Sequence, residues 1–318
     1  MKLTVTRGLS EVVPRPHPVV TIGNFDGHHL GHRVLLETVV RTARTFDGTA
    51  IVLTFDPHPI KVLAPHVHLR FLTSPEEKLR RFETAGIDEV IFLEFTETLA
   101  AMMPEEFTKS ILCRRLGIKE LFVGEHFAFG KGRSGRIADL ERFGAAYGFK
   151  VHPMKPVTLN GGIISSTRIR NLIQEGRMQE ATSLLGRPYG IGGTVVQGRQ
   201  QGQALGWPTA NLKVPPDRVL PPDGVYAVRV SLESSAYDAI AYIGTRPTFG
   251  AGERLIEVNL LDQQRNLYGR DLFVEFIERL RGDHRFDSPD ELSAQIGRDV
   301  ERARTSLSGF RKDHETNR

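Results

Sequence analysis

Cysteine and long apolar runs are scarce in this sequence, and each scarcity excludes a class of protein. The one cysteine, Cys113, rules out an internal disulfide, and its place in a helical apolar pattern predicts a buried, inert thiol. No apolar run approaches the ~20 residues that a membrane-spanning helix needs. Because the first residues also lack the apolar core of a signal peptide, we expect a cytoplasmic protein.

A strong charge of either sign is missing as well. The formal net charge is +4 among 318 residues, and the charged positions are scattered along the chain. This mild charge suits anionic small substrates as well as nucleic acid, but an RNA-binding protein would show a broad basic surface, and the scattered charge argues against one. We expect small-molecule substrates, no nucleic-acid or membrane partner, and a monomer or weak homo-oligomer. With 40% hydrophobic and 25% charged residues the composition is that of a soluble globular protein, long enough for two domains.

What the sequence does contain is a glycine-punctuated turn between a buried strand and a helix. Residues 19–22 form an apolar run, residues 34–43 repeat apolar side chains at helical spacing, and Gly23, Gly27 and Gly31 lie between them. Glycines let a backbone approach a ligand closely, and a helix start offers unpaired N–H groups to an anion. This turn therefore predicts a phosphate site.

Two histidines, His29 and His32, stand where that helix begins. Their spacing lets both imidazoles donate to one polyphosphate, which favours nucleotidyl transfer chemistry. The alternative is structural, with His29 packed under the turn and His32 capping the helix. Asp26 in the same turn is either an ordinary turn residue or, beside a triphosphate, a ligand of Mg²⁺.

The segment 161–170 contains a second phosphate-binding pattern. Two glycines lead into a run of hydroxyls and then into Arg168 and Arg170, ahead of the apolar pattern of a helix. A plain N-cap role for Ser165 or Ser166 is the alternative. The run Ser-Ser-Thr-Arg-Ile-Arg is similar to the phosphate-clamping signature that accompanies His-x-Gly-His in nucleotidyltransferases, where hydroxyls and an Arg hold the β- and γ-phosphates.

The hydrophobic patterns change texture near residue 186. Before it, they predict strands at 19–22, 50–55, 89–95 and 120–123 and helices at 31–45, 75–86, 104–116, 137–148, 168–175 and 178–185, an α/β doubly wound arrangement. After it, short strands at 190–196, 226–232, 239–243, 257–261 and 272–276 indicate an antiparallel barrel, and Ser288 caps a final helix. We predict domains at 1–186 and 187–310, with a polar, disordered tail at 311–318.

Several motifs together resemble the bacterial bifunctional riboflavin kinase/FMN adenylyltransferase family, the prokaryotic FAD synthetases, over nearly the whole chain. The N-terminal half has Gly-Asn-Phe-Asp-Gly at 23–27, His-x-Gly-His at 29–32, Leu-Thr-Phe-Asp-Pro-His-Pro at 53–59, Val-Gly-Glu-His-Phe-Ala-Phe-Gly at 123–130 and Ser-Ser-Thr-Arg-Ile-Arg at 165–170. The C-terminal half has Leu-Gly-Trp-Pro-Thr-Ala-Asn-Leu at 205–212, Gly-Val-Tyr-Ala-Val at 224–228, Ile-Gly-Thr-Arg-Pro-Thr-Phe at 243–249 and Ile-Glu-Val-Asn-Leu-Leu-Asp at 256–262.

The resemblance implies an N-terminal doubly wound, Rossmann-like nucleotidyltransferase domain and a C-terminal riboflavin kinase barrel with a terminal helix. It implies phosphorylation of riboflavin to FMN by ATP, and then adenylylation of FMN by ATP to FAD with release of pyrophosphate. Mg²⁺ is the implied cofactor.

The resemblance also assigns residues. In the N-terminal half, His29, His32 and Arg168 are catalytic, and Gly23, Phe25, Asp26, Gly31, Ser165, Ser166 and Thr167 bind ATP or phosphate. Flavin binding falls on Phe55, Pro57, His126, Phe127 and Arg246. His126 departs from the Asn or Asp usual in its motif, so the affinity for flavin or its pH dependence differs here if this side chain contacts the ligand.

In the C-terminal half, Thr209 and Asn211 are implied ligands of Mg²⁺ and phosphate, and Gly198 and Gly202 border ATP. Glu257 is the implied base for the riboflavin 5′-hydroxyl. Taken without the resemblance, Thr209 to Asn211 is also compatible with a hydroxyl or Asx turn, and Glu257 with a charge at a strand edge. The basic glycine-rich segment 130–136 is either a surface loop or a lid.

Two other functional classes share part of these features. An adenylyltransferase acting on pantetheine phosphate or nicotinamide mononucleotide would share His-x-Gly-His, yet it would not explain the C-terminal motifs. A non-catalytic flavin carrier would bind riboflavin without consuming ATP. Chromatography of flavins after incubation with riboflavin, ATP and Mg²⁺ distinguishes the carrier from the enzyme.

Overall fold

The computed structural model describes residues 2–197, 207–245, 254–263 and 265–315. Contacts divide the chain into two compact units, Met1–Ser165 and Ser166–Arg318. The boundary predicted at residue 186 concerns where the two activities separate, and it stays a prediction.

The first unit is built on a six-stranded parallel sheet with the order β1-β4-β3-β2-β5-β6. Its strands are β1 (Thr4–Arg7), β2 (Pro18–Ile22), β3 (Thr49–Asp56), β4 (Glu89–Glu94), β5 (Glu120–Gly124) and β6 (Lys150–Met154). Helices on both faces bury such a sheet completely, and every residue of β2 is buried. The chain order reverses at β2, between β3 and β5, which is where doubly wound sheets bind ligands.

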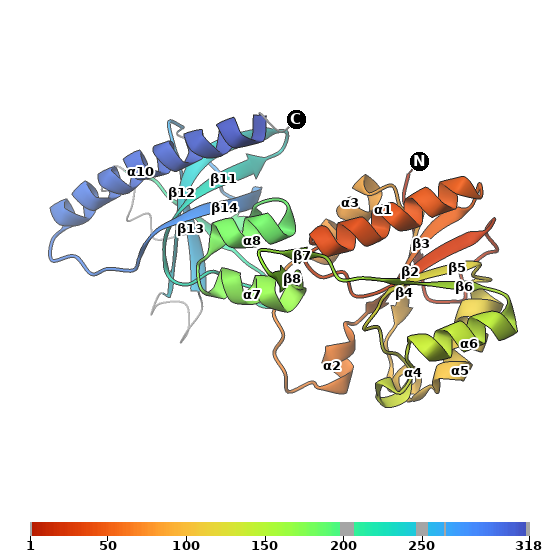
Figure 1. The fold of residues 1–318 in the computed structure, drawn as a ribbon. Coiled ribbons are helices and arrows are strands. Elements are labelled where there is room, and N and C mark those ends of the chain that lie inside the picture. The colour runs from red at the N-terminus through yellow and green to blue at the C-terminus, as the bar shows by residue number, and fades with distance from the viewer. Residues whose placement is uncertain (1, 198–206, 246–253, 264, 316–318) are drawn as a thin grey trace. The chain divides into compact units, whose positions relative to one another are not determined.

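Helices cover the two faces of this sheet (Figure 1). They are α1 (Leu30–Thr45), α2 (Pro59–Leu63), α3 (Pro75–Thr84), α4 (Glu97–Ala101), α5 (Pro104–Phe107), the π-helical η1 (Thr108–Arg115), the 3-10 turn η2 (Lys131–Arg133) and α6 (Ile137–Tyr147). Val19 and Val52 pack into the core on the side of α1 and α3, whereas Val20 and Leu53 pack on the side of η1 and α6. A short hairpin, β7 (Thr158–Leu159) and β8 (Gly162–Ile163), follows the sheet.

The second unit is a closed antiparallel barrel with the order β10-β13-β12-β11-β14-β9. Its strands are β9 (Tyr189–Val196), β10 (Ala210–Lys213), β11 (Gly224–Leu232), β12 (Ser235–Thr245), β13 (Arg254–Leu260) and β14 (Asp271–Gly282). Alternate side chains of a barrel strand point inside and outside. The residues Val258 and Leu260 of β13 are therefore on one face, and Glu257 and Asn259 on the other.

Among its described residues, the second unit also contains the helices α7 (Ser166–Gln174), α8 (Met178–Leu185) and α10 (Pro289–Glu315). Helix α10 lies along the outside of the barrel, where its Val300, Ala303 and Leu307 pack against residues such as Ile240 and Leu261. Helix α8 contacts β14 and β9.

The predicted strands and helices are present with their ends shifted by a few residues, and both predicted fold classes are confirmed. The cap predicted at Ser288 is also confirmed, and α3 begins with a capping box at Ser74. The strands β1, β6, β7, β8 and β10 and the short helices α2 and α4 were not predicted. The disorder expected after Phe310 is wrong as far as Glu315, because α10 continues to that residue.

Candidate active sites

The predicted phosphate turn joins the end of β2 to the start of α1. The flavin motifs follow β3 and β5, the neighbours of β2 on either side, so all three segments leave the same edge of the sheet. Sequence motifs that are far apart along the chain therefore meet at one edge of the first unit.

The backbone of this turn is strained. Gly27 has a φ of +84°, and a Cβ atom there would lie 2.6 Å from the Leu72 side chain. Phe25 and His28 also adopt positive φ angles, 50° and 44°, although neither is a glycine. Such conformations cost about 1–2 kcal/mol each and cluster at ligand-binding sites. Phe25 and His28 are retained there because Phe82 packs edge-on against both rings, 5.5 and 5.7 Å away.

Asp26 is the clamp that holds this turn to the next segment. Its carboxylate is 3% exposed and accepts hydrogen bonds from the backbone N–H of Leu72 (3.0 Å) and Thr73 (3.2 Å) and from the Thr73 hydroxyl. That hydroxyl accepts in turn from the Gly27 N–H. The carboxylate thus has a structural role in the protein without ligand. The phosphate or Mg²⁺ role predicted for Asp26 is untested.

The structural alternative expected His32 to cap helix α1 and His29 to pack under the turn. In the structure His29 is the cap, and His32 lies in the first turn of the helix. The Nδ1 atom of His29 accepts the backbone N–H of His32 at 3.3 Å. A neutral imidazole with an accepting Nδ1 has its proton on Nε2. The fold therefore sets the tautomer of His29 and leaves Nε2–H as its donor. Gly31 makes room for the ring, since a Cβ there would lie 3.2 Å from it.

The two imidazoles are stacked on each other. The centroids of His29 and His32 are 3.6 Å apart with an interplanar angle of 15°, and Phe25 meets His32 edge-on at 5.1 Å. Burial lowers the pKa of His32 well below 6.5, and nearby His29, His28 and Lys78 lower this pKa further. His32 is therefore neutral near pH 7 in the free protein. Its buried Nδ1 has no hydrogen-bond partner among the described residues.

Phe25 is 2% exposed and forms part of the hydrophobic core beneath the turn. Its ring packs edge-on against His32 and so helps to fix the position of that imidazole. The predicted flavin residues follow the carboxyl ends of their strands. Phe55 meets Phe95 edge-on at 5.5 Å, and Phe127 stacks on Phe129 at 5.8 Å. His126 is 78% exposed, with Nε2 3.5 Å from a Glu125 carboxylate oxygen.

The predicted phosphate clamp spans the division between the two units. Ser165 ends the first unit, and the carbonyl of the buried Ile164 before it lies 3.9 Å from where a Cβ of Gly31 would stand. Ser166, Thr167 and Arg168 form the first turn of α7 in the second unit. Their phosphate roles stay predictions.

In the barrel, one row of residues crosses three strands. Asn211 on β10 is paired with Glu257 on β13, and Glu257 is paired with Tyr242 on β12. Side chains at directly paired positions of antiparallel strands are neighbours, with Cβ atoms about 4.5–5.5 Å apart. Thr209, just before β10, donates its hydroxyl to Glu257 Oε2 at 3.4 Å. The ladder thus brings together the three predicted kinase residues.

This row contains a buried amide acceptor. The side chain of Asn211 is 6% exposed, and its Oδ1 has no hydrogen-bond partner among the described residues. A buried carbonyl oxygen without a donor is costly unless something binds it. An amide oxygen beside a hydroxyl and a carboxylate is a donor set that suits Mg²⁺. Gly198, Gly202 and Arg246 lie outside the described residues.

A cavity of about 470 Å³ lies between the end of β13 and α10, lined by residues that include Trp207, Pro208, Asn259, Val300 and Arg304. Trp207 is held there because its indole N–H donates to the Ser293 hydroxyl at 3.3 Å. Asn259 fixes the chain before Thr209, since its amide donates to the Pro208 carbonyl at 2.7 Å.

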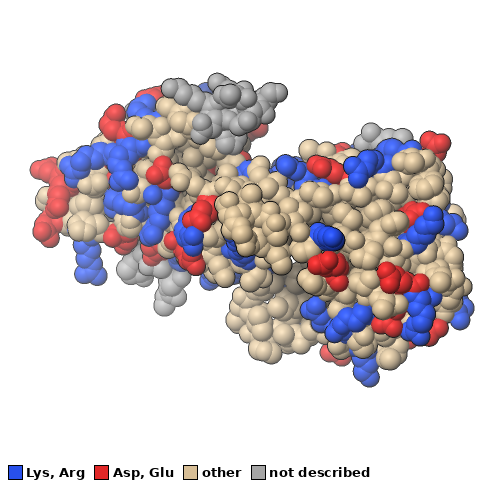
Figure 2. Space-filling view, in the orientation of Figure 1, with Lys and Arg blue, Asp and Glu red and all other residues tan. Residues whose placement is uncertain are grey.

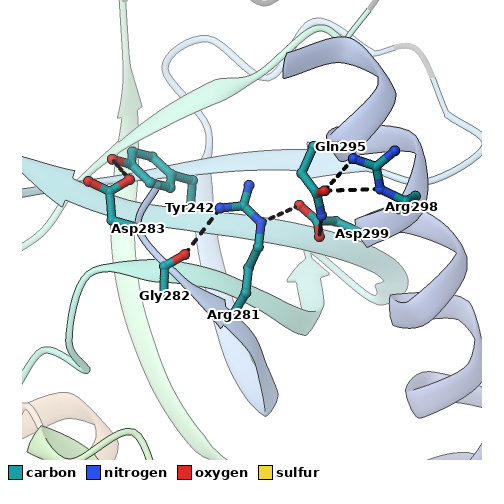
Figure 3. A network of polar contacts seen from close by, with 7 residues as sticks. All are labelled: Tyr242, Arg281, Gly282, Asp283, Gln295, Arg298 and Asp299. Carbon is teal, nitrogen blue, oxygen red and sulfur yellow. Dashed lines mark hydrogen bonds and ion pairs between the residues drawn. The ribbon is translucent and has the colours of Figure 1, made fainter. Parts of the chain in front are cut away.

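The end of β14 is tied to α10 through Arg281, and the residue that follows the strand, Asp283, is tied to β12 (Figure 3). The Tyr242 hydroxyl donates to Asp283 at 3.1 Å. Burial, and to a lesser extent the negative charge of Asp283, raises the pKa of Tyr242 to about 12. Arg281 pairs with Asp299 at 2.8 Å, and Asp299 is 1% exposed and also accepts from Gln295. Tyr242 was missed from the sequence, because only the strand register places it beside Glu257.

Charges of both signs are interspersed on the face shown in Figure 2. No helix among the described residues has the length and the apolar character that crossing a membrane requires.

Known proteins resemble the chain along both units. A family model described as FAD synthetase matches residues 14–168, and one described as riboflavin kinase matches residues 185–307. A bifunctional riboflavin kinase/FMN adenylyltransferase of Escherichia coli K12 is 39% identical over 305 residues, covering 95% of this chain and 97% of the relative. The protein of the same name from Haemophilus influenzae is 36% identical, and the match covers 90% of this chain and 92% of the relative. A solved structure titled macrolide-efflux protein from Streptococcus pneumoniae has a TM-score of 0.87 and 31% sequence identity, and the match covers 96% of this chain and 99% of the other.

Proposed function

The chain belongs to the family of bifunctional riboflavin kinases/FMN adenylyltransferases, and from this membership we propose how its residues divide the work. The enzyme phosphorylates riboflavin to FMN with ATP, and adenylylates FMN with ATP to FAD, releasing pyrophosphate. We assign the kinase step to the barrel and the adenylyl step to the turn after β2. We place the functional boundary at residue 186, with domains at 1–186 and 187–310.

The observation that supports the kinase site best is the paired row of Asn211 and Glu257 with Thr209 beside it. Glu257 accepts the proton of the riboflavin 5′-hydroxyl as that oxygen attacks the γ-phosphorus of ATP, and ADP departs with the electron pair of the broken bond. Thr209 and Asn211 would hold Mg²⁺ and the adjoining phosphate oxygens. When bound, Mg²⁺ neutralises charge on the transferring phosphoryl group. The 470 Å³ cavity lined by Pro208 and Asn259 has the size of a small-molecule site and accepts one of the two planar rings, flavin or adenine.

In the adenylyl step, a phosphate oxygen of FMN attacks the α-phosphorus of ATP, and the bond to the β-phosphate oxygen breaks. His29 donates from Nε2 to the polyphosphate, a role supported by the cap that sets its tautomer. Neutral His32 stacks behind it and orients it. Ser165, Ser166, Thr167 and Arg168 bind the departing phosphates. Phe55, Pro57, His126 and Phe127 form the flavin side of this site.

Glu257→Gln tests the kinase assignment. A general base contributes roughly 10²–10⁴-fold to the rate, so this variant should lose riboflavin phosphorylation by that factor, while its thermal unfolding and its conversion of supplied FMN to FAD stay unchanged. Glu275→Gln is the matched control, because Glu275 also lies in a barrel strand between buried apolar residues. Normal phosphorylation by Glu257→Gln, or a loss only in step with its folded fraction, would make Glu257 a structural carboxylate.

The remaining assignments concern the environment of the enzyme. We propose a cytoplasmic enzyme that acts as a monomer or weak homo-oligomer, and that has no nucleic-acid or membrane partner. Sedimentation at several protein concentrations tests the oligomeric state.

A further inference from the structure

The row of kinase residues in the barrel continues one strand beyond Glu257. Tyr242 on β12 is paired directly with Glu257 on β13, and Asn211 on β10 is paired with Glu257 from the other side. Directly paired residues of an antiparallel ladder place their side chains on the same face, with Cβ atoms about 4.5–5.5 Å apart. On this face Tyr242 is partly buried and packs against the cluster that includes Ile240 and Val300. Glu257 therefore lies between an amide and an aromatic ring.

The Tyr242 ring is held at both ends. A Cβ atom at Gly244 would lie 2.5 Å from the ring carbon Cζ of Tyr242, so the ring lies along β12 in the space that this glycine leaves. At the far end of the ring, the hydroxyl donates to Asp283 at 3.1 Å (Figure 3). The hydroxyl is therefore directed along β12 to Asp283, and the body of the ring is the part of Tyr242 beside Glu257.

The partner of the Tyr242 hydroxyl is itself fixed by the barrel and α10. Asp283 follows β14 directly. Two residues before it, Arg281 pairs with the buried Asp299 of α10 at 2.8 Å and donates to the Gly282 carbonyl at 3.1 Å. The orientation of the Tyr242 ring is thus defined by a chain of contacts that begins on another strand and a helix.

Tyr242 does not exchange a proton near neutral pH. Burial contributes most to raising its pKa to about 12, Asp283 contributes next, and the negative charge of Glu257 adds a smaller effect. The hydroxyl therefore keeps its proton near pH 7 and serves as a donor to Asp283. What Tyr242 offers to Glu257 is a rigid apolar surface.

Such a surface restricts where the Glu257 carboxylate can lie. A glutamate side chain is long and loses considerable rotamer freedom when it is fixed, and a general base must lie within hydrogen-bond reach of the proton that it takes. The Oε2 atom of Glu257 accepts from Thr209 at 3.4 Å, at the end of the row where Asn211 lies. The Tyr242 ring occupies the opposite side, so the carboxylate is directed toward Thr209 and Asn211.

We propose that Tyr242 is a positioning residue of the riboflavin kinase site, whose ring keeps the Glu257 carboxylate on the side of Thr209 and Asn211. The proposal rests on the base role assigned to Glu257. In the reaction the riboflavin 5′-oxygen bonds to the γ-phosphorus of ATP, its proton passes to Glu257, and ADP departs with the electron pair of the broken bond. Tyr242 transfers no proton and acts on the rate through the position of the base.

Steady-state kinetics of riboflavin phosphorylation by the full-length enzyme test the proposal. Misplacement of a catalytic group costs up to roughly 100-fold in rate, so Tyr242→Leu should lower kcat by about 10- to 100-fold and leave the KM values for riboflavin and ATP unchanged. Tyr242→Phe keeps the ring and should restore most of kcat. Tyr237→Leu is the control, because Tyr237 also lies on β12 but is paired with Val230, and it should match the wild type. Conversion of supplied FMN to FAD should not change.

A double-mutant cycle with Glu257→Gln shows whether Tyr242 acts through the base. If it does, Tyr242→Leu should lower kcat no further in the Glu257→Gln enzyme, because residues that act as a unit are not additive. Additive effects of the two changes overturn the proposal, and so does a wild-type kcat in Tyr242→Leu.

Three other results also contradict the positioning role. A raised KM for riboflavin at unchanged kcat in Tyr242→Leu would mean that the ring contacts the substrate. An equal loss of kcat in Tyr242→Phe would mean that the hydroxyl is what matters. A loss that follows only the folded fraction, measured by thermal unfolding, would make Tyr242 structural. If Glu257→Gln phosphorylates riboflavin at the wild-type rate, the base assignment itself is wrong, whatever Tyr242 does.

Discussion

Replacing Asp26 by alanine distinguishes its structural role, the hydrogen bonds that it accepts from Leu72 and Thr73, from a role in binding phosphate or Mg²⁺. The carboxylate accepts from two backbone N–H groups, those of Leu72 and Thr73, whose residues are 2% and 4% exposed. A buried donor left without an acceptor costs about 1–3 kcal/mol. For the two N–H groups, with partial relaxation, we expect the first unit to lose about 3 kcal/mol of unfolding free energy.

For a unit of this length, such a loss lowers the Tm by roughly 6–12 °C. Differential scanning calorimetry of the full chain measures the shift, and riboflavin phosphorylation at a temperature below the transition shows whether the barrel is intact. Asp26→Asn keeps the shape and one acceptor oxygen, so its Tm should fall by less than half as much. If Asp26→Ala melts with the wild type and yet forms no FAD, Asp26 is a ligand of the substrate or metal and the reasoning is refuted.

Three further predictions concern His32, Asp299 and the domain boundary. The folded state lowers the pKa of His32 below 6.5, so the unfolded chain binds a proton at this imidazole more readily, and the free energy of unfolding falls as the pH drops from 6.5 toward the pKa of the folded state. His32→Gln should flatten the dependence of Tm on pH in this window. An unchanged dependence would contradict the lowered pKa of His32. Asp299→Ala leaves Arg281 without its buried partner, which should destabilise the barrel by about 3–5 kcal/mol in chemical denaturation while FAD formation from FMN persists. A fragment of residues 187–318 should still phosphorylate riboflavin. A fragment of residues 166–318 should have a higher Tm, because it keeps α8, which buries Leu184 and Leu185 and contacts β14 and β9. If the 187–318 fragment is folded but inactive, the functional boundary lies before residue 186.

Elements with a strong apolar period were predictable from the sequence, and weakly patterned ones were not. Strand β1 has only four residues, three of them exposed, so it lacks the apolar run of a central strand. Strand β6 contains Pro153 and exposed charge, as edge strands do. Strand β10 is short and begins inside the Pro-Thr-Ala-Asn motif, which its turn-forming residues marked as a turn.

Motifs located both candidate sites, but they did not give the arrangement of the side chains. Whether His29 or His32 caps α1 depends on the backbone at one residue, and the result decides which ring nitrogen has the proton. The partners of Asp26 lie 46 and 47 residues further along the chain, so spacing could not reveal them. Tyr242 belongs to no motif, and only the strand register brings it beside Glu257.

The barrel ladder also bears on how this family can vary in sequence. Glu257 and Asn211 face each other because β10 is hydrogen-bonded on both sides, to β13 and to β9. A single inserted residue within β10 or β13 would turn one of the two side chains to the opposite face and separate them. Insertions in the turns between strands leave the register intact. Length changes in relatives that keep both activities should therefore accumulate between the strands, while β10 and β13 keep their length.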